Sequence, residues 1–257
     1  MALLIDPPRF AAHGRLWSHL VSDTSIEELH GFARRAGLPA WGFEGDHYDV
    51  PEERYDDVVA AGALPVDGRR VVRALVDSGL RMRKRKGDRG IARVRADFPD
   101  GASATVDLIR GDREVDERRV FCAMVFVVDA GGDHLVVHSV RRQQWGPPGG
   151  EREPDETVRR AAVRELQEET GLVADVARLA PVGYERFADL GGTDRWPPGR
   201  DLMQLYRLDL AEPRPPVGRV LDDVDGCRWV TTDELVDLCG DTFWWPVAEA
   251  VLTRRAG

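Results

Sequence analysis

The chain has 257 residues, of which 42% are hydrophobic and 32% charged, and its formal net charge is −9. A length of this order allows one or two domains of about 150 residues each. The composition is that of an ordinary globular protein, which excludes collagen-like and disordered classes, and the acidic balance argues against nucleic acid as a partner.

The N-terminal residues MALLIDPPRF lack a basic start followed by a long apolar segment, so we expect no secretory signal and a cytoplasmic protein. The longest apolar run, residues 120–128, is far shorter than the roughly 20 residues of a membrane span, so no membrane partner is expected. The three cysteines form no CxxC pattern, which argues against a disulfide framework or a structural zinc site.

Short apolar runs alternate with helical patterns in the first 80 residues. We predict strands at 2–6 and 40–45, and helices at 24–36, 51–61 and 67–80. Strands separated by helices favour a parallel sheet with helices packed on it, so this part is expected to be a small α/β domain.

A dense basic run, RMRKRKGDR at residues 81–89, follows the last of these helices. The favoured interpretation is a solvated helix end and an exposed linker, and the alternative is a phosphate-binding patch. We therefore place a domain boundary near residue 88, giving domains at 1–88 and 89–257 that are expected to fold separately.

The patterning changes after this boundary, where strands and hairpins predominate. We predict two alternating strands at 92–98 and 103–110, then a hairpin of a buried strand and its neighbour at 120–129 and 134–140. After a helix that ends at Gly171, the remaining predicted elements are a strand at 179–183, a loop at 185–200, strands at 202–210 and 227–230, and two short C-terminal helices.

The helix that ends at Gly171 carries an unusual acidic cluster in the stretch RELQEETGL. Glu165, Glu168 and Glu169 lie at i, i+3 and i+4, which places three carboxylates on one face. Like charges at these spacings destabilise a helix by about 0.2–0.5 kcal/mol per pair, and Arg164 can compensate only Glu168 at the i+4 spacing. Helix stability therefore does not explain the cluster.

The stretch from residue 150 to residue 172 resembles the Nudix box, the signature of the Nudix hydrolase superfamily. Its matching positions are Gly150, Glu156, Arg164-Glu165-Leu166, Glu168-Glu169 and Gly171-Leu172. The resemblance implies an α/β/α sandwich with a mixed sheet over 118–257, preceded here by the small α/β domain. It also implies a pyrophosphohydrolase that cleaves a nucleoside diphosphate linked to another moiety.

The resemblance also implies roles for individual residues. Glu168 and Glu169 match the principal metal ligands, Glu165 matches a metal-bridging residue or the base, and Arg164 matches the group that orients a glutamate. Glycine allows close approach, so the carbonyl of Gly149 is a further candidate ligand. Carboxylate and carbonyl oxygens suit Mg²⁺ or Mn²⁺, which neutralise phosphate oxygens and activate water.

The family often adds an acidic ligand or base from a later loop, sometimes just before a Trp on a strand. In this sequence Arg228 precedes Trp229, so the position of that group stays open. The candidates are Asp222, Asp223, Asp225 and Glu185.

Substrate contacts are less specific in the sequence. Tyr184, Phe187 and Trp196 could stack on a base and Arg141 could pair with phosphate, although packing and surface charge explain them nearly as well. Nucleoside triphosphates, damaged nucleotides, ADP-ribose, dinucleotides and sugar nucleotides all fit the same box. Homodimers are frequent in the superfamily. The alternative function is a non-catalytic nucleotide sensor with the N-terminal domain as its output.

The N-terminal domain resembles a bacterial domain of unknown function in two stretches, GRLWSHL at 14–20 and GDHYDVPE at 45–52. Asp6 ends the first predicted strand, Asp46 and His47 follow the second, and His19 follows an apolar Leu-Trp pair. Polar residues at the ends of parallel strands are where open α/β sheets bind ligands. These four residues are therefore candidates for a metal or phosphoester site, and capping and turn roles are the alternative.

Overall fold

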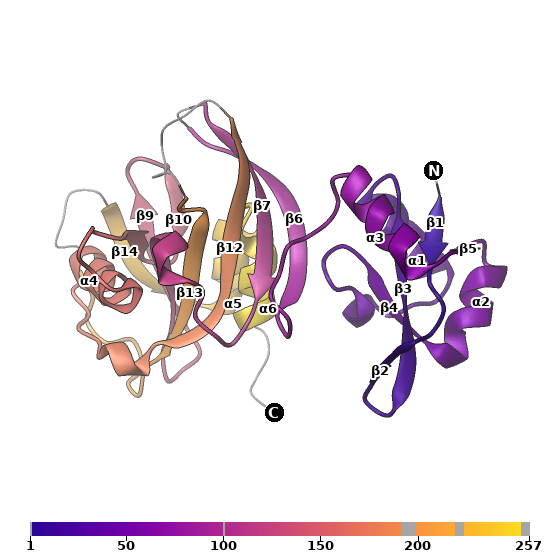
Figure 1. Cartoon of the computed structure of the whole chain (residues 1–257). Helices are drawn as coiled ribbons and strands as arrows, with labels where there is room; N and C mark the ends of the chain where they lie inside the picture. The colour runs from indigo at the N-terminus through magenta and orange to yellow at the C-terminus, as the bar shows by residue number, and fades with distance from the viewer. Residues whose placement is uncertain (1, 100, 192–198, 219–223, 253–257) are drawn as a thin grey trace. The chain divides into compact units, whose positions relative to one another are not determined.

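The computed structural model describes residues 2–99, 101–191, 199–218 and 224–252. The chain divides into two compact units, Met1–Ala92 and Arg93–Gly257, each of which has its own helices (Figure 1). Strand β6, Arg89–Asp97, crosses this division and begins directly after the predicted boundary. In the part of the chain that the structure describes, no helix has both the length and the hydropathy to cross a membrane.

The first unit contains a five-stranded sheet in the order β2-β3-β1-β5, with β4 also paired to β3. Its strands are β1 Leu3–Ile5, β2 Phe10–Ala12, β3 Arg15–Ser22, β4 Tyr48–Pro51 and β5 Leu64–Pro65. Of the described strand pairs in this sheet only β1–β5 is parallel, so the predicted parallel arrangement is wrong for the rest of it. For the β2–β3 pair the reason is a tight hairpin at His13 and Gly14, both with positive φ, which folds β2 back on β3.

The helices of the first unit lie close to their predicted places. They are α1 Ile26–Arg35, α2 Tyr55–Ala60 and α3 Gly68–Asp77, with 3₁₀ turns at Ala40–Gly42 and Glu52–Arg54. The Ser25 side chain caps α1 and the Asp67 side chain caps α3, each by accepting a backbone N–H of the first turn. The strand predicted at 40–45 is wrong, because the chain makes a 3₁₀ turn there and β4 begins only at Tyr48.

The basic run at 81–89 is exposed at several positions, as the sequence suggested, but ion pairs and the buried Met82 attach it to the first unit. Arg81 pairs with Asp46 and Lys84 pairs with Glu44 at 2.7 Å, so these charges are used within the first unit. Met82 is 1% exposed. Ion pairing and burial therefore hold this segment against residues 44–46.

The second unit contains a nine-stranded mixed sheet in the order β10-β9-β8-β13-β12-β7-β6, in which β11 also pairs with β8 and β14 with β9. Besides β6, its strands are β7 Ser103–Arg110, β8 Val120–Val128, β9 His134–Ser139, β10 Gln144–Gly146, β11 Gly149–Glu151, β12 Ala180–Gly191, β13 Leu202–Asp209 and β14 Val224–Val230. The β8–β13 pair is parallel, and β8 is buried along its whole length. The mixed α/β architecture predicted for this part is confirmed.

Strand β12 is much longer than the predicted strand at 179–183. It pairs with β13 on one side and β7 on the other, and Glu185 lies opposite Met203 and Leu108. The prediction of a loop at 185–200 is therefore wrong for its first residues, which belong to β12. Pairing with a neighbour on each side extends the strand, and the residue pattern of one strand does not reveal which strands it pairs with.

Three of the described α-helices pack on this sheet: α4 Val158–Thr170, α5 Thr232–Cys239 and α6 Trp245–Leu252. Helix α4 contacts β8 and β11, whereas α6 contacts β7 and β12. Figure 1 shows α4 and the α5–α6 pair over separate regions of the sheet. Two 3₁₀ turns, Glu117–Arg119 and Val176–Arg178, complete the described helical elements of this unit.

Candidate functional site

Helix α4 presents its acidic residues beside a cavity of the second unit. The Thr157 side chain caps the N-terminus of the helix, and Gly171 ends it in the left-handed conformation with φ 75°. Glu165 is 9% exposed and Glu169 5% exposed, whereas the Glu168 side chain is one-third exposed. The apolar stripe of the helix is buried against the sheet, so its packing determines where the carboxylates lie.

Arg164 connects the acidic residues to one another and to the preceding loop. Its Nη1 donates to Glu165 Oε1 at 2.8 Å and to Glu168 Oε2 at 2.9 Å. The other side of the guanidinium donates to both oxygens of Glu156 and to the carbonyl of Glu151. The hydrogen bonds to Glu156 are the main cause that raises the pKa of Arg164. Arg164 thus holds two of the three glutamates, and a cation would compete with it for them.

Two glycines before the helix allow the backbone to approach the carboxylates. The Gly149 N–H donates to Glu169 Oε2 at 2.8 Å. A Cβ on Gly150 would lie 2.4 Å from the Glu165 carboxylate, and one on Gly149 would lie 2.3 Å from the carbonyl oxygen of Ala123. Any side chain at either position would therefore displace the glutamate or the neighbouring strand.

Glu185 adds a fourth carboxylate from β12. It is 1% exposed, and neither of its carboxylate oxygens has a hydrogen-bond partner among the residues that the structure describes. Burial raises its pKa to about 8, although the positive charge of Arg142 acts in the opposite direction. Burying an acid in this way is costly for folding alone, which makes Glu185 a candidate for the acidic group outside the box.

Glu165, Glu169 and Glu185 line one cavity of about 860 Å³. The predicted substrate contacts Arg141 and Phe187 also line it. The structure therefore brings together three carboxylates, a guanidinium and an aromatic ring from distant parts of the sequence.

Two other predicted substrate contacts are not in this lining. Tyr184 is 3% exposed and lies next to Glu185 on β12, so its side chain is directed to the other face of the sheet. Trp196 lies outside the described residues, as do Asp222 and Asp223. Asp225, the remaining candidate for the outside acid, pairs with His138 at 2.5 Å.

Several cavity residues were missed by the sequence analysis. They are aromatic or basic side chains from different segments of the chain: Arg95, Phe98, Trp145, Phe243 and Trp244. Trp145 could have been noticed because it directly precedes the glycine- and proline-rich loop before α4. The Arg228 guanidinium lies over the Trp145 ring at 4.7 Å. Arg228, at the position before Trp229 where the family often has an acidic residue, therefore packs on Trp145, which lines the cavity.

The four polar residues predicted as a second site also come together, in the first unit. His19 Nδ1 lies 3.1 Å from Asp6 Oδ2, and His47 Nδ1 lies 2.5 Å from Asp46 Oδ1. Burial lowers the pKa of His47, but hydrogen bonds to Asp46 and Asp49 outweigh it and raise that pKa to about 9. Asp49, the fifth member of the cluster, was not predicted as a site residue.

Comparison with known proteins finds two families in the chain. Residues 118–252 match the model of the NUDIX domain, and residues 3–78 match that of a protein of unknown function, DUF4031. Over 112 residues, which are 43% of this chain and 67% of the relative, the sequence is 34% identical to phosphatase NudJ of Escherichia coli K12.

Solved structures show more distant similarity. A Nudix hydrolase from M. smegmatis, RenU, is 22% identical and aligns over 64% of this chain and 98% of its own, with a TM-score of 0.40. The Bacillus subtilis pyrophosphohydrolase BsRppH, in a point-mutant form, is 20% identical over 53% of this chain and 77% of its own, also with a TM-score of 0.40. The resemblance noted in the sequence of both units is thus confirmed by the family models.

Proposed function

The chain belongs to the NUDIX family and is a Nudix-type hydrolase of phosphoanhydride bonds, and from this premise we propose that it cleaves a nucleoside diphosphate linked to another moiety. The observation that carries this proposal is the joint lining of one cavity by Glu165, Glu169 and the buried Glu185. The same cavity has arginines and aromatic rings, which suit phosphates and a base.

The family uses divalent metal ions, and the donors at this place suit a hard cation. The four glutamates offer carboxylate oxygens, and one of them, Glu185, is buried without a hydrogen-bond partner in the described part of the chain. We propose Mg²⁺ or Mn²⁺ as the ion, with Glu165, Glu168 and Glu169 as the residues that hold it and the Gly149 carbonyl as a further ligand. When bound, the ion supplies charge neutralisation for phosphate oxygens and activation of water.

The protein groups then have separate tasks. Arg164 positions Glu165 and Glu168, because it contacts both and is itself held by Glu156. Glu165 or Glu185 accepts the proton of the attacking water, since both carboxylates line the cavity. Arg141 pairs with a phosphate oxygen, and Phe187 contributes to a stacking surface for the base.

The test is a panel of nucleoside triphosphates, damaged nucleotides, ADP-ribose, dinucleotides and sugar nucleotides with Mg²⁺, followed by identification of the products. Turnover to two phosphate-bearing fragments that is lost in Glu169→Gln supports the proposal. The matched control is Glu249→Gln, which removes an exposed carboxylate of α6 that does not line the cavity. Tight binding of one compound without turnover of any would instead support a nucleotide sensor and overturn the hydrolytic assignment.

A further inference from the structure

A second group of possible metal ligands lies in the first unit, far in sequence from the NUDIX match. His19, His47 and Asp49 each offer one ligand atom, and these atoms all lie within 4.8 Å of one another. His19 on β3 is directly opposite Asp49 on β4 in the antiparallel register, and His47 comes just before β4. Strand pairing therefore determines the relative position of two of the three side chains.

The distances fit a small divalent ion. Asp49 Oδ1 lies 3.3 Å from His47 Nε2 and 4.0 Å from His19 Nε2. Ligands bound at about 2.0–2.1 Å in a tetrahedral zinc site lie about 3.4 Å apart, so movements of less than about 1 Å would bring all three to bonding distance. Such shifts are within the freedom of side-chain torsions.

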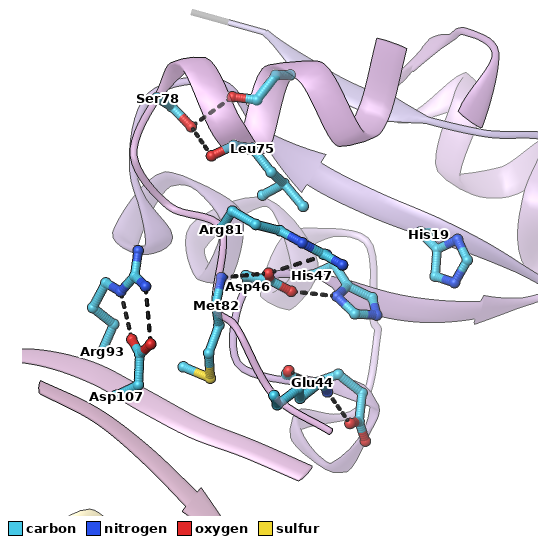
Figure 2. Close-up of polar contacts among 12 residues, drawn as sticks. His19, Glu44, Asp46, His47, Leu75, Ser78, Arg81, Met82, Arg93 and Asp107 are labelled. Carbon is cyan, nitrogen blue, oxygen red and sulfur yellow. Dashed lines mark hydrogen bonds and ion pairs between the residues drawn. The ribbon is translucent and has the colours of Figure 1, made fainter. Parts of the chain in front are cut away.

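Each histidine is oriented by a buried carboxylate behind it. Asp6, 3% exposed, accepts from His19 Nδ1, and it also accepts the backbone N–H of His19 at 2.6 Å. Asp46, 0% exposed, accepts from His47 Nδ1 and from the backbone N–H of Met82, as Figure 2 shows. Because a carboxylate only accepts, Nδ1 carries the hydrogen in both rings and Nε2 is the atom that faces a ligand. In His47 an ion at Nε2 would replace the proton that faces Asp49 Oδ1 at 3.3 Å.

This arrangement is the usual one behind metal-binding histidines, in which the second ring nitrogen donates to a carboxylate. Ion pairing alone explains part of the cluster, because a protonated His47 between Asp46 and Asp49 forms two short contacts. The contact of His19 Nε2 with Asp49 is weaker, because at 4.0 Å it is at the limit of ion-pair distance and beyond hydrogen-bond distance. An ion between the three side chains accounts for both Nε2 atoms.

We propose that His19, His47 and Asp49 bind one divalent transition-metal ion of the zinc class, with Asp6 and Asp46 as positioning residues. The two imidazoles separate this site from the all-oxygen glutamate site of the second unit, since imidazole favours Zn²⁺ and related ions over Mg²⁺. The side chains of His19 and Asp49 are 26% and 36% exposed. Three protein ligands at the surface leave a coordination position open to solvent, as in catalytic zinc sites.

The test uses the full chain in excess Mg²⁺, which occupies the carboxylates of the second unit. Co²⁺ is titrated as a coloured probe of Zn²⁺ sites and is then displaced by Zn²⁺. We expect visible absorption bands that saturate at one equivalent of Co²⁺ and disappear when Zn²⁺ is added. His19→Gln and Asp49→Asn should each weaken binding by more than about 100-fold, and Asp6→Asn by about 10–100-fold, which is typical of groups that orient a ligand.

The matched control is His13→Asn, which removes an exposed histidine of the same unit at a positive φ that Asn tolerates. Circular dichroism checks the fold of each variant, and Asp49 is exposed enough that its substitution opens no cavity in the core. The proposal is overturned if wild type gives no saturable bands, or if His19→Gln and Asp49→Asn bind Co²⁺ as tightly as wild type. Nucleotide hydrolysis, measured in parallel, reports on the glutamate site, so failure of either proposal is distinguishable from failure of the other.

Discussion

Replacing Gly150 with alanine should impair catalysis while leaving the fold intact. The added Cβ would lie 2.4 Å from the Glu165 carboxylate, whereas ordinary contact begins at 3.4 Å, so the carboxylate must move by about 1 Å. The atoms that must move are the end of a flexible side chain, which makes the change cheap for folding. A displacement of about 1 Å at a reacting group costs on the order of 100-fold in rate, or about 2.7 kcal/mol in the activation barrier.

The assay is steady-state kcat with Mg²⁺ on the substrate found by the panel, together with the thermal midpoint of unfolding. Two other glycines provide the comparison. Gly149→Ala places its Cβ 2.3 Å from the Ala123 carbonyl oxygen, which is backbone of a buried strand, so it should lower stability by about 1–3 kcal/mol. Gly218→Ala meets no atom of the described residues within 4 Å and should leave both quantities unchanged.

A Gly150→Ala protein with the kcat of wild type would refute the reasoning, because Glu165 would then tolerate displacement. Loss of stability equal to that of Gly149→Ala would also refute it, since the carboxylate would not be the group that yields. The expected pattern is therefore low kcat with a normal midpoint for Gly150→Ala, and a low midpoint for Gly149→Ala.

Four further predictions concern the metal, the buried acid and the domain boundary. Glu168→Gln and Glu169→Gln should each lower kcat by several orders of magnitude with an intact circular dichroism spectrum, and wild-type activity in both would remove the metal assignment. Mg²⁺ or Mn²⁺ at about 100 times its Kd should raise the free energy of unfolding by about 2.7 kcal/mol over EDTA, as measured by thermal or urea unfolding. In the folded protein the pKa of Glu185 is raised to about 8, so the free energy of unfolding in EDTA should fall as pH rises from about 4.5 through about 8. Glu185→Gln should reduce this dependence of stability on pH. An unchanged dependence in the variant would show that Glu185 is not the group responsible. A fragment of residues 89–257 should fold and retain hydrolysis, and a folded but inactive fragment would show that the N-terminal unit contributes to the active site.

The local part of the glutamate site follows from the sequence alone. Helical geometry places residues at i, i+3 and i+4 on one face, so the spacing of Glu165, Glu168 and Glu169 is sufficient to group them. The same geometry predicts the contact from Arg164 to Glu168. The left-handed end of the helix at Gly171 also follows from a single residue, because glycine adopts this conformation without strain.

The rest of the two sites depends on contacts between residues far apart in sequence. Glu185 was one of four candidate acids, and β12 had to pair with β7 and β13 before Glu185 could be placed in the cavity wall. Residues 95–99 line the same cavity, although they precede the segment that matches the NUDIX model. Strand β6 ends among these residues and belongs to the same sheet as β12. Strand pairing has no signature in the pattern of one strand, so the sequence could not reveal it.

The first unit shows the same division. Asp6, Asp46 and His47 were recognised from their residue types and their places near predicted strand ends, and His19 from its place after an apolar pair. The expected parallel sheet is nevertheless mostly antiparallel. The antiparallel register of β3 and β4 brings His19 opposite Asp49, which was not among the four candidate residues. Residue type thus determined which chemistry was available, and tertiary structure decided which groups meet, because strand register is set by packing and turn geometry across the whole unit.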